Sequence, residues 1–212
     1  MANFLELVSA RQDMILDAFM EHLYLSFIAV AVGIVISLPL GIFVARYRKF
    51  AEPIIGVTAV FQTIPSLALF GFLVPILGIG STTALVALII YALLPILRNT
   101  FTGITTVDQS IIEAGRGMGM TRTQILRQIE LPLALPFIMA GIRTATVLTV
   151  GIATLATFVG AGGLGDIIYR GLQSYNNGLV LAGALPVAIL AIGFDLVLKW
   201  IEKKSTPKGL KM

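Results

Sequence analysis

Long apolar stretches alternate with short polar segments along the chain, and this pattern determines the expected fold. A helix needs about 20 residues to cross about 30 Å of hydrocarbon, and five of the stretches reach or approach that length. The pattern therefore predicts an all-α membrane protein with about five transmembrane helices. The expected spans cover residues 23–45, 54–77, 82–98, 133–158 and 178–200.

Charged and reactive residues are scarce, which excludes several classes of protein. Charged residues make up 12% of the chain, whereas soluble domains have about 25%. The chain has no cysteine and one histidine, His22, so disulfides, thiolate catalysis and Cys-ligated metals are excluded and no metal site is expected. His22 begins an apolar run and is expected to be an interfacial anchor. The basic residues form no face with interleaved aromatics, so nucleic-acid binding is not expected.

The basic residues also predict the orientation in the membrane. Cytoplasmic loops are enriched in Lys and Arg, and here these residues follow the first, third and fifth spans. An outer N-terminus and an inner C-terminus place twelve of the fifteen in the cytoplasm. This N-out/C-in topology predicts an extracellular segment 1–22, a transmembrane domain 23–200 with a cytoplasmic loop 99–131, and a cytoplasmic tail 201–212 whose stretch 205–209 is frayed.

The loop 99–131 carries the signals of two short helices joined by a glycine turn. Ser110–Glu113 and Thr121–Gln124 each fit a capping box, in which two side chains satisfy free N–H groups at a helix start. Gly117 and Gly119 lie between them, as in a turn that needs an unusual φ. Leu131–Pro132 is expected to end the second helix.

The first of these helices is expected to dock into a groove on another protein. Its apolar knob consists of Ile111, Ile112 and Ala114, and the charged residues Glu113 and Arg116 flank it. The pattern alone fits an amphipathic helix on the headgroups of membrane lipid equally well.

The spacing of this loop resembles the EAA loop of ABC-importer permeases. That loop reads Glu-Ala-Ala, three residues, Gly, nine residues, and Ile-x-Leu-Pro. Gly115 stands where the family usually has its second Ala, which preserves a close helix approach and adds flexibility. The matching positions are Glu113, Ala114, Gly119, Ile129, Leu131 and Pro132.

The resemblance implies a type I ABC importer permease fold and a transport role rather than an enzyme. In ABC importers this loop is a coupling helix in a cleft of a separate ATPase subunit, and closure of two ATPases rocks two permease subunits. The chain has no Gly-x-x-x-x-Gly-Lys-Ser/Thr loop, so no cofactor is expected in it and ATP and Mg²⁺ are expected on the partner ATPase. The other expected partners are a second permease subunit, identical or paralogous, and an extracellular substrate-binding protein, at a bacterial plasma membrane.

Three further stretches resemble permeases for osmoprotectants, the quaternary amines glycine betaine, carnitine and choline. They are residues 62–70, residues 94–100 with 102–104, and residues 160–165. No cluster of Trp and Tyr within a span offers an aromatic cage for a quaternary ammonium, so specificity is expected in the binding protein. Methionine-uptake permeases share the EAA loop and are the alternative among importers. A self-sufficient secondary carrier or channel is the alternative of a different class.

Pro65 is expected to break a helix within the second span. Proline removes a backbone N–H donor, and freed backbone groups inside the membrane are tolerated only against protein or a watery cavity. A kinked packing helix with back-bonded Ser and Thr side chains fits the pattern equally well. The residues expected in a pathway or gate region are Phe61, Gln62, Thr63, Pro65, Ser66 and Phe70.

Arg143 and Asp195 are the ionisable residues expected inside the spans. Charges within the membrane are costly and are usually paired, and both residues lie toward the cytoplasmic half of their spans. The sequence therefore predicts an intramembrane Arg143–Asp195 ion pair or a contact with a partner subunit. Snorkelling by Arg143 and hydration of Asp195 near the interface are the alternative.

Overall fold

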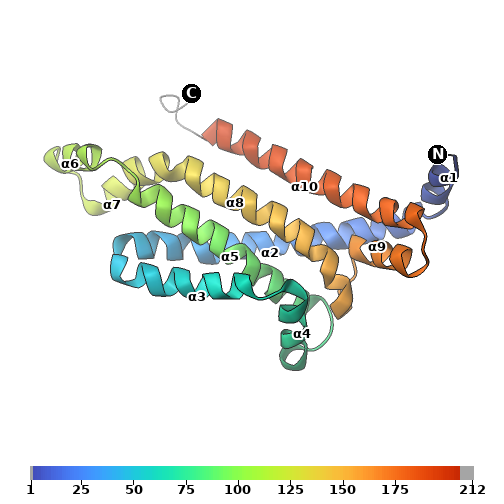
Figure 1. Ribbon diagram of the computed structural model, residues 1–212. Helices are drawn as coiled ribbons and strands as arrows, with labels where there is room; N and C mark the ends of the chain where they lie inside the picture. Colours follow the sequence, from blue (N-terminus) through green and yellow to red (C-terminus); the bar gives the residue numbers. More distant parts are fainter. Residues whose placement is uncertain (1, 206–212) are drawn as a thin grey trace.

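The computed structural model describes residues 2–205, which form a bundle of long helices with short helices at its two ends (Figure 1). The tail expected beyond Ser205 lies outside the described residues. The elements are α1 (Ala2–Ala10), α2 (Gln12–Arg46), a 3₁₀ turn (Arg48–Phe50), α3 (Ala51–Thr63), α4 (Ser66–Leu77), α5 (Ser81–Thr105), α6 (Gln109–Gly117), α7 (Arg122–Ile125), a π-helical turn (Leu126–Glu130), α8 (Leu131–Ala153), a 3₁₀ segment (Thr154–Val159), α9 (Leu164–Gln173) and α10 (Asn177–Ser205).

The five expected spans are present if one bent pair of helices counts as a single span. Four helical stretches of the described chain are long and apolar enough to cross a membrane: α2, α5, the continuous run 122–159 and α10. The second expected span consists of α3 and α4, which meet at an angle of 100°. The helix that contains the first expected span begins at Gln12, because α2 continues beyond the apolar stretch with Asp13 and Asp17 exposed on its surface.

Small residues hold α2 and α5 close together at the centre of the bundle. Gly33 faces Ala92, and a Cβ added at Gly41 would lie 2.7 Å from the Cβ of Thr100. Ser37 also donates a hydrogen bond from Oγ to the carbonyl oxygen of Leu93, 3.1 Å away. Close approach through small residues and interhelical hydrogen bonds is the usual way in which helices associate in a membrane, where lipid removes the hydrophobic drive. The two helices therefore form one packed unit.

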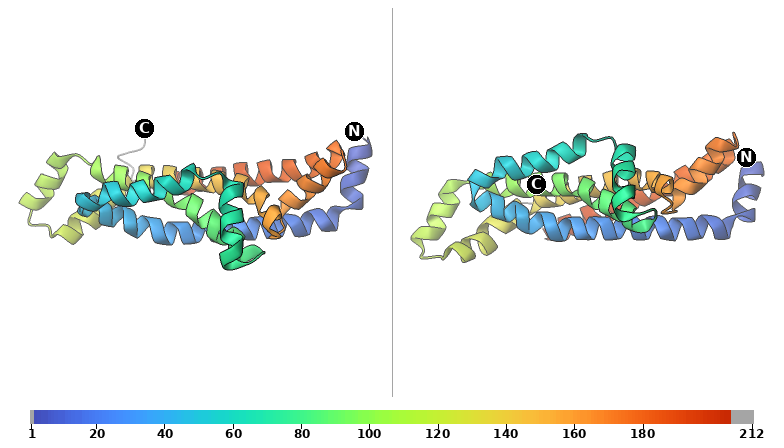
Figure 2. Two further views of the ribbon diagram at one scale, coloured as in Figure 1. Left: turned by 60° about the horizontal axis from the view of Figure 1, so that its bottom comes forward. Right: turned by 90° about the horizontal axis from the view of Figure 1, so that it is seen from below.

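Different short helices lie at the two ends of the bundle. α6 and α7 lie at one end, and α1 and α9 lie at the other, beside the N-terminus (Figure 1). Both further views show the same separation, and they show α4 projecting sideways from the bundle (Figure 2). Because the basic loop lies at the α6 end and α10 runs toward that end, the arrangement agrees with an N-out/C-in orientation.

Candidate functional site

The short helix α6 begins at an aspartate rather than at the expected serine. The backbone N–H of Ser110 donates to Asp108 Oδ1 at 2.8 Å, so Asp108 is the N-cap and the predicted capping box at Ser110–Glu113 is wrong. Asp is among the preferred N-cap residues, and it captures the helix start two positions earlier. The same hydrogen bond holds the pKa of the Asp108 carboxyl below its usual value.

The turn and the second short helix follow the sequence prediction more closely. Gly119 has φ +80°, in the left-handed region that favours glycine, whereas Gly117 is the last residue of α6 and has no positive φ. A reciprocal capping box is present: Gln124 N–H donates to Thr121 Oγ1 at 3.3 Å, and Thr121 N–H donates to Gln124 Oε1 at 2.7 Å. The prediction of this capping box is confirmed.

Leu131 and Pro132 do not end the second helix, contrary to expectation. The helix continues from α7 through a π-helical turn at Leu126–Glu130 into α8, with Pro132 in the first turn of α8. Proline is tolerated at such a position, and a π turn changes the hydrogen-bond register that proline would otherwise interrupt. The short helix next to α6 is therefore rigidly joined to a membrane span.

The residues that match the EAA pattern divide into an outward and an inward set. Glu113 and Ala114 are exposed on α6, whereas Gly115 is buried. A Cβ added at Gly115 would lie 2.8 Å from Ile129 Cδ1, so Gly115 allows α6 to pack closely on the helix that leads into the membrane. Gly119 forms the exposed turn, and Ile129, Leu131 and Pro132 are half-buried at the base of that helix.

The outward surface of α6 is smaller than the predicted knob. Ile111 and Met118 are 43% and 75% exposed, but Ile112 is buried against Val107 and Ile125. The expectation that Ile112 contributes to the knob is therefore wrong, because it faces the helix behind α6. The exposed carboxylate of Glu113 has no partner within the described chain and is free to meet another protein.

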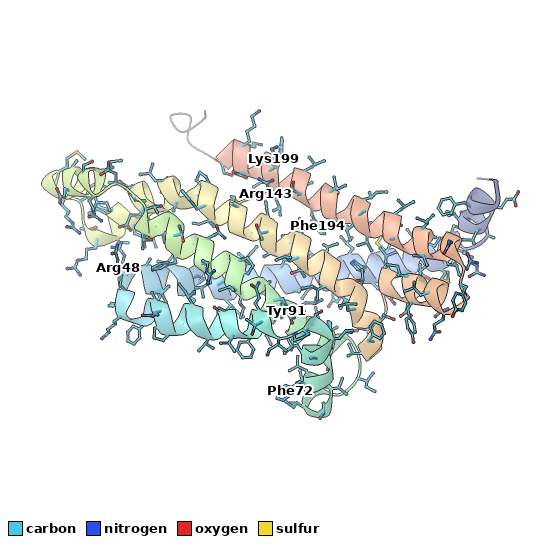
Figure 3. All side chains as sticks on the ribbon, viewed as in Figure 1. Arg48, Phe72, Tyr91, Arg143, Phe194 and Lys199 are labelled. Carbon is cyan, nitrogen blue, oxygen red and sulfur yellow. The ribbon has the colours of Figure 1, made fainter. Side chains whose placement is uncertain are left out.

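The break between α3 and α4 occurs at the expected proline. Ile64 is extended, with ψ 128°, as is common before proline. The Tyr91 hydroxyl of α5 donates to the carbonyl oxygen of Ile64, and Gln62 Nε2 donates to the carbonyl oxygen of Tyr91 at 3.3 Å. Figure 3 shows Tyr91 close to this break and Phe72 of α4 pointing away from the bundle. Two side chains thus stabilise backbone groups near the point where the helix is interrupted.

The other residues of the expected pathway region have different surroundings. Phe61 is 38% exposed, Ser66 is half-buried, and Thr63 donates a back-bond to the carbonyl oxygen of Val60 at 2.7 Å. Phe70 is 1% exposed and belongs to the core cluster with Leu25 and Leu88. In this conformation Phe70 therefore packs inside the subunit and does not line an open path.

Arg143 of α8 lies beside α10 (Figure 3), where it forms an ion pair with Asp195. Arg143 Nε donates to Asp195 Oδ1 at 2.8 Å, and Nη1 donates to Glu202 Oε2 at 3.2 Å. Glu202 is two helical turns after Asp195, so one guanidinium joins two carboxylates on the same face of α10. No group of three metal-ligating side chains that could hold an ion is present within residues 2–205.

The outer end of α2 holds a set of contacts that the sequence did not predict. His22 is fully buried, and its Nε2 donates to the carbonyl oxygen of Val150 at 3.0 Å, so the expectation of an interfacial anchor is wrong. The neighbouring Glu21 accepts a hydrogen bond at Oε2 from the N–H of Gly163 at 2.8 Å. The segment 160–177 is mostly the helix α9, and it begins with a run of glycines, three of which have positive φ.

The fold defines a multi-pass membrane protein in which a short helix, α6, packs against a helix that is continuous with a membrane span. The family model for the binding-protein-dependent transport system inner membrane component matches residues 37–207. The chain belongs to this family. It is the permease subunit of an ABC importer that works with ATPase and binding-protein partners, and it is not an enzyme.

Individual relatives agree with this assignment over most of the chain. It is 52% identical over 191 residues to the glycine betaine/carnitine/choline transport system permease protein OpuCB of Bacillus subtilis (strain 168), covering 90% of this chain and 88% of that protein. It is 49% identical to the carnitine transport permease protein OpuCB of Listeria monocytogenes, with the same coverage. An inward-facing structure of the MetNI methionine ABC transporter superposes with a TM-score of 0.81 at 26% identity, covering 93% of this chain and 99% of that one.

Proposed function

We propose that this permease imports quaternary-amine osmoprotectants of the glycine betaine, carnitine and choline class across a bacterial plasma membrane. The observation that carries the proposal is the 52% identity, over 90% of the chain, to a permease named for these three solutes. Identity to the methionine transporter is half as high, at 26%. The shared fold supports the importer class, and the difference in identity favours the osmoprotectants over methionine.

The exposed part of α6 is the surface proposed to engage the ATPase. Glu113 and Ala114 point outward, and Gly115 packs α6 onto the helix that continues through the π turn into α8. A force applied to α6 therefore reaches a membrane span through direct packing and through the continuous helix from α7. ATP and Mg²⁺ are bound by that ATPase subunit in this proposal, and a second permease subunit, identical or paralogous, completes the pathway.

The outer end of the molecule is the surface proposed to meet the substrate-binding protein. α9 presents exposed polar and aromatic groups there, and Tyr175, which follows it, is 95% exposed. Within the described chain, the contacts between aromatic rings join only pairs at the two ends, such as Phe158 with Tyr169, and none forms a cage inside the bundle. A quaternary ammonium is held well by a cage of aromatic rings. Selection of the solute is therefore assigned to the binding protein, and this chain supplies the passage.

Uptake by cells tests the proposed substrate class. Labelled glycine betaine is supplied at high osmolality to cells that lack this chain and to cells in which it is restored, with unlabelled choline, carnitine or methionine in excess. Uptake that needs the chain and is blocked by choline or carnitine is the expected result. Chain-dependent uptake that only methionine blocks, or uptake that does not depend on the chain, would contradict the proposed substrates.

A further inference from the structure

A single helix, α2, makes polar contacts at both ends of the bundle. It contains 35 residues in an unbroken α-helix, which corresponds to a length of about 52 Å at 1.5 Å per residue. Its cytoplasmic end lies beside α6 and α7, and its outer end lies beside the glycine run that leads into α9 (Figure 1). It therefore reaches from the surface proposed for the ATPase to the surface proposed for the binding protein.

The cytoplasmic contact is an ion pair between Arg46 and Glu130. Arg46 Nη2 lies 3.1 Å from Glu130 Oε2, and the same Nη2 donates to the carbonyl oxygen of Arg122 at 3.1 Å. The Glu130 side chain is only 8% exposed, and its Oε2 has no aligned hydrogen bond within the described chain. A buried carboxylate without a hydrogen bond depends on a nearby positive charge. Glu130 occupies the variable position of the Ile-x-Leu-Pro segment, so the resemblance gives it no role.

Arg46 contacts two parts of the segment 109–130, which contains α6, α7 and the π-helical turn and is called the docking element below. Arg122 begins α7, and Glu130 ends the π-helical turn that joins α7 to α8. Arg46 also lines a cavity of about 440 Å³ together with Ile112 and Arg116 of α6. A displacement of the docking element relative to the membrane therefore acts on the end of α2 through Arg46.

The outer contact joins α2 to the corner between α8 and α9. Glu21 accepts the N–H of Gly163, and the next residue, His22, donates to the carbonyl oxygen of Val150 near the end of α8. The fit is tight: Gly162 and Gly163 have φ of +76° and +83°, and a Cβ at Gly162 would collide with the Glu21 carboxylate. The corner is therefore positioned by α2 and not only by its own chain connections.

The middle of α2 is packed tightly against its neighbour α5. Gly33 and Gly41 bring its backbone against α5, and Ser37 bonds across to Leu93. Packed interiors shift as units rather than deforming continuously. A movement at one end of this α2–α5 unit is therefore transmitted to the other end.

We propose that α2 is a strut that carries the movement of the docking element to the outer loop, with Arg46 and Glu130 as positioning residues at its inner joint and Glu21 at its outer joint. The inference rests on the proposed function of α6 as the ATPase contact. It makes a specific prediction because the joints act in series. The effects of distant, independent sites combine additively in free energy, so their fold-effects on transport multiply. If the two joints act in series, the loss of one already interrupts transmission, and the loss of the second lowers transport little further.

The test measures glycine betaine uptake and ATP hydrolysis by the complete complex in proteoliposomes, for the natural chain and for Arg46→Ala, Glu21→Ala and the double variant. Each single variant is expected to retain hydrolysis and to lower the number of solutes imported per ATP several-fold. The double variant is expected to be no worse than the worse single variant. Arg48→Ala and Asp17→Ala are matched controls, since each removes an exposed charge of the same sign close to one joint.

Two rescue variants separate positioning from general damage. The double exchange Arg46→Glu with Glu130→Arg is expected to recover most of the number of solutes imported per ATP. Glu21→Gln is expected to retain this number, because an amide oxygen still accepts a hydrogen bond from the Gly163 N–H. Three results would overturn the strut proposal. They are fold-effects that multiply in Arg46→Ala with Glu21→Ala, a parallel loss of uptake and ATP hydrolysis, and an unchanged number of solutes per ATP in both single variants.

A second readout does not depend on the solute, so it distinguishes failure of the strut from failure of the proposed substrate. The chain has no cysteine, and Tyr175→Cys places a single spin label at the exposed outer end of this chain in a purified complex, whether the second permease subunit is identical or paralogous. MgATP is expected to change the mobility of this label in the natural background but not in Arg46→Ala. An equal change in both backgrounds would overturn the strut even if glycine betaine is not transported. Absence of glycine betaine uptake by the natural complex would count against the substrate alone.

Discussion

Arg143 on α8 and Asp195 on α10 form a two-point ion pair: Nε lies 2.8 Å from Oδ1, and Nη2 lies 3.2 Å from Oδ2. Arg143 also holds Glu202 at 3.2 Å, and its side chain is 28% exposed. The guanidinium fork matches a carboxylate at two points, which gives geometric specificity as well as energy. These contacts fix the crossing of the last helix over α8, on a face where α10 has few buried residues of its own.

The ion pair predicts an unequal cost for removal of its members. Arg143→Met removes the guanidinium that Asp195 and Glu202 share, whereas Asp195→Asn leaves Arg143 paired with Glu202. A charge within a membrane helix is costly when it loses its partner. We expect the thermal stability of the purified complex to fall by several degrees for Arg143→Met and by less for Asp195→Asn. A larger loss for Asp195→Asn would contradict this assignment, and Lys203→Met, which removes an exposed charge from the same helix, serves as the control.

The docking helix predicts variants that separate transport from assembly. Glu113→Lys reverses an exposed charge that has no partner within the described chain, and Gly119→Asp places a side chain at φ +80°. Both are expected to abolish or strongly reduce uptake while membrane insertion, followed by the amount of protein in the membrane, is unchanged. Gly117→Ala is the matched control, because Gly117 has open space around it and no positive φ. Normal uptake by either test variant would refute the role given to α6.

The cap of α6 predicts a further effect with a defined dependence on pH. Asp108→Ala removes the acceptor for the Ser110 N–H and is expected to weaken the start of α6 and lower uptake, whereas Asp108→Asn retains an acceptor. The pKa of the Asp108 carboxyl is lowered by that hydrogen bond, so its contribution is complete above the ordinary pKa and is lost as pH falls through the lowered value. Asp108 therefore adds no pH dependence to uptake between about pH 5 and 8. Uptake of Asp108→Ala equal to that of the natural chain would show that the cap is dispensable.

The broken second span predicts residues that affect passage rather than folding. Gln62→Ala removes the hydrogen bond to the Tyr91 carbonyl oxygen, and Ser66→Ala removes a half-buried hydroxyl at the start of α4. Both are expected to alter the rate of uptake at an unchanged protein level. Thr58→Ala, which removes a back-bonded hydroxyl from α3 away from the break, is the control. Unchanged uptake in both test variants would favour a packing role for this region.

Several elements could be predicted because local physics determines them. Apolar length marked the spans, Pro65 marked the break because it lacks an N–H, and Thr121 with Gln124 marked a capping box. Other elements depend on partners distant in the sequence. No local signal shows that His22 meets Val150 or that Glu130 meets Arg46, so these buried polar residues were mispredicted or missed.

Other differences between the sequence predictions and the structure arise from sequence features that fit more than one structure. A proline near the end of a helix also fits the first turn of the next one, and the π turn before Pro132 made the two helices continuous. Ile112 was apolar and close to Glu113, but which face it occupies depends on how α6 packs against Ile125. The size of the bend at Pro65, 100°, depends on packing against α5 and not on proline alone.

The most direct test of the account is transport by the reconstituted complex. Proteoliposomes that contain this chain, its ATPase and its partner permease are supplied with labelled glycine betaine, with and without the binding protein and internal MgATP, while ionophores remove all ion gradients. The account predicts uptake that requires both ATP and the binding protein and that excess choline or carnitine prevents. Uptake that continues without ATP, or that needs an ion gradient instead, would contradict it.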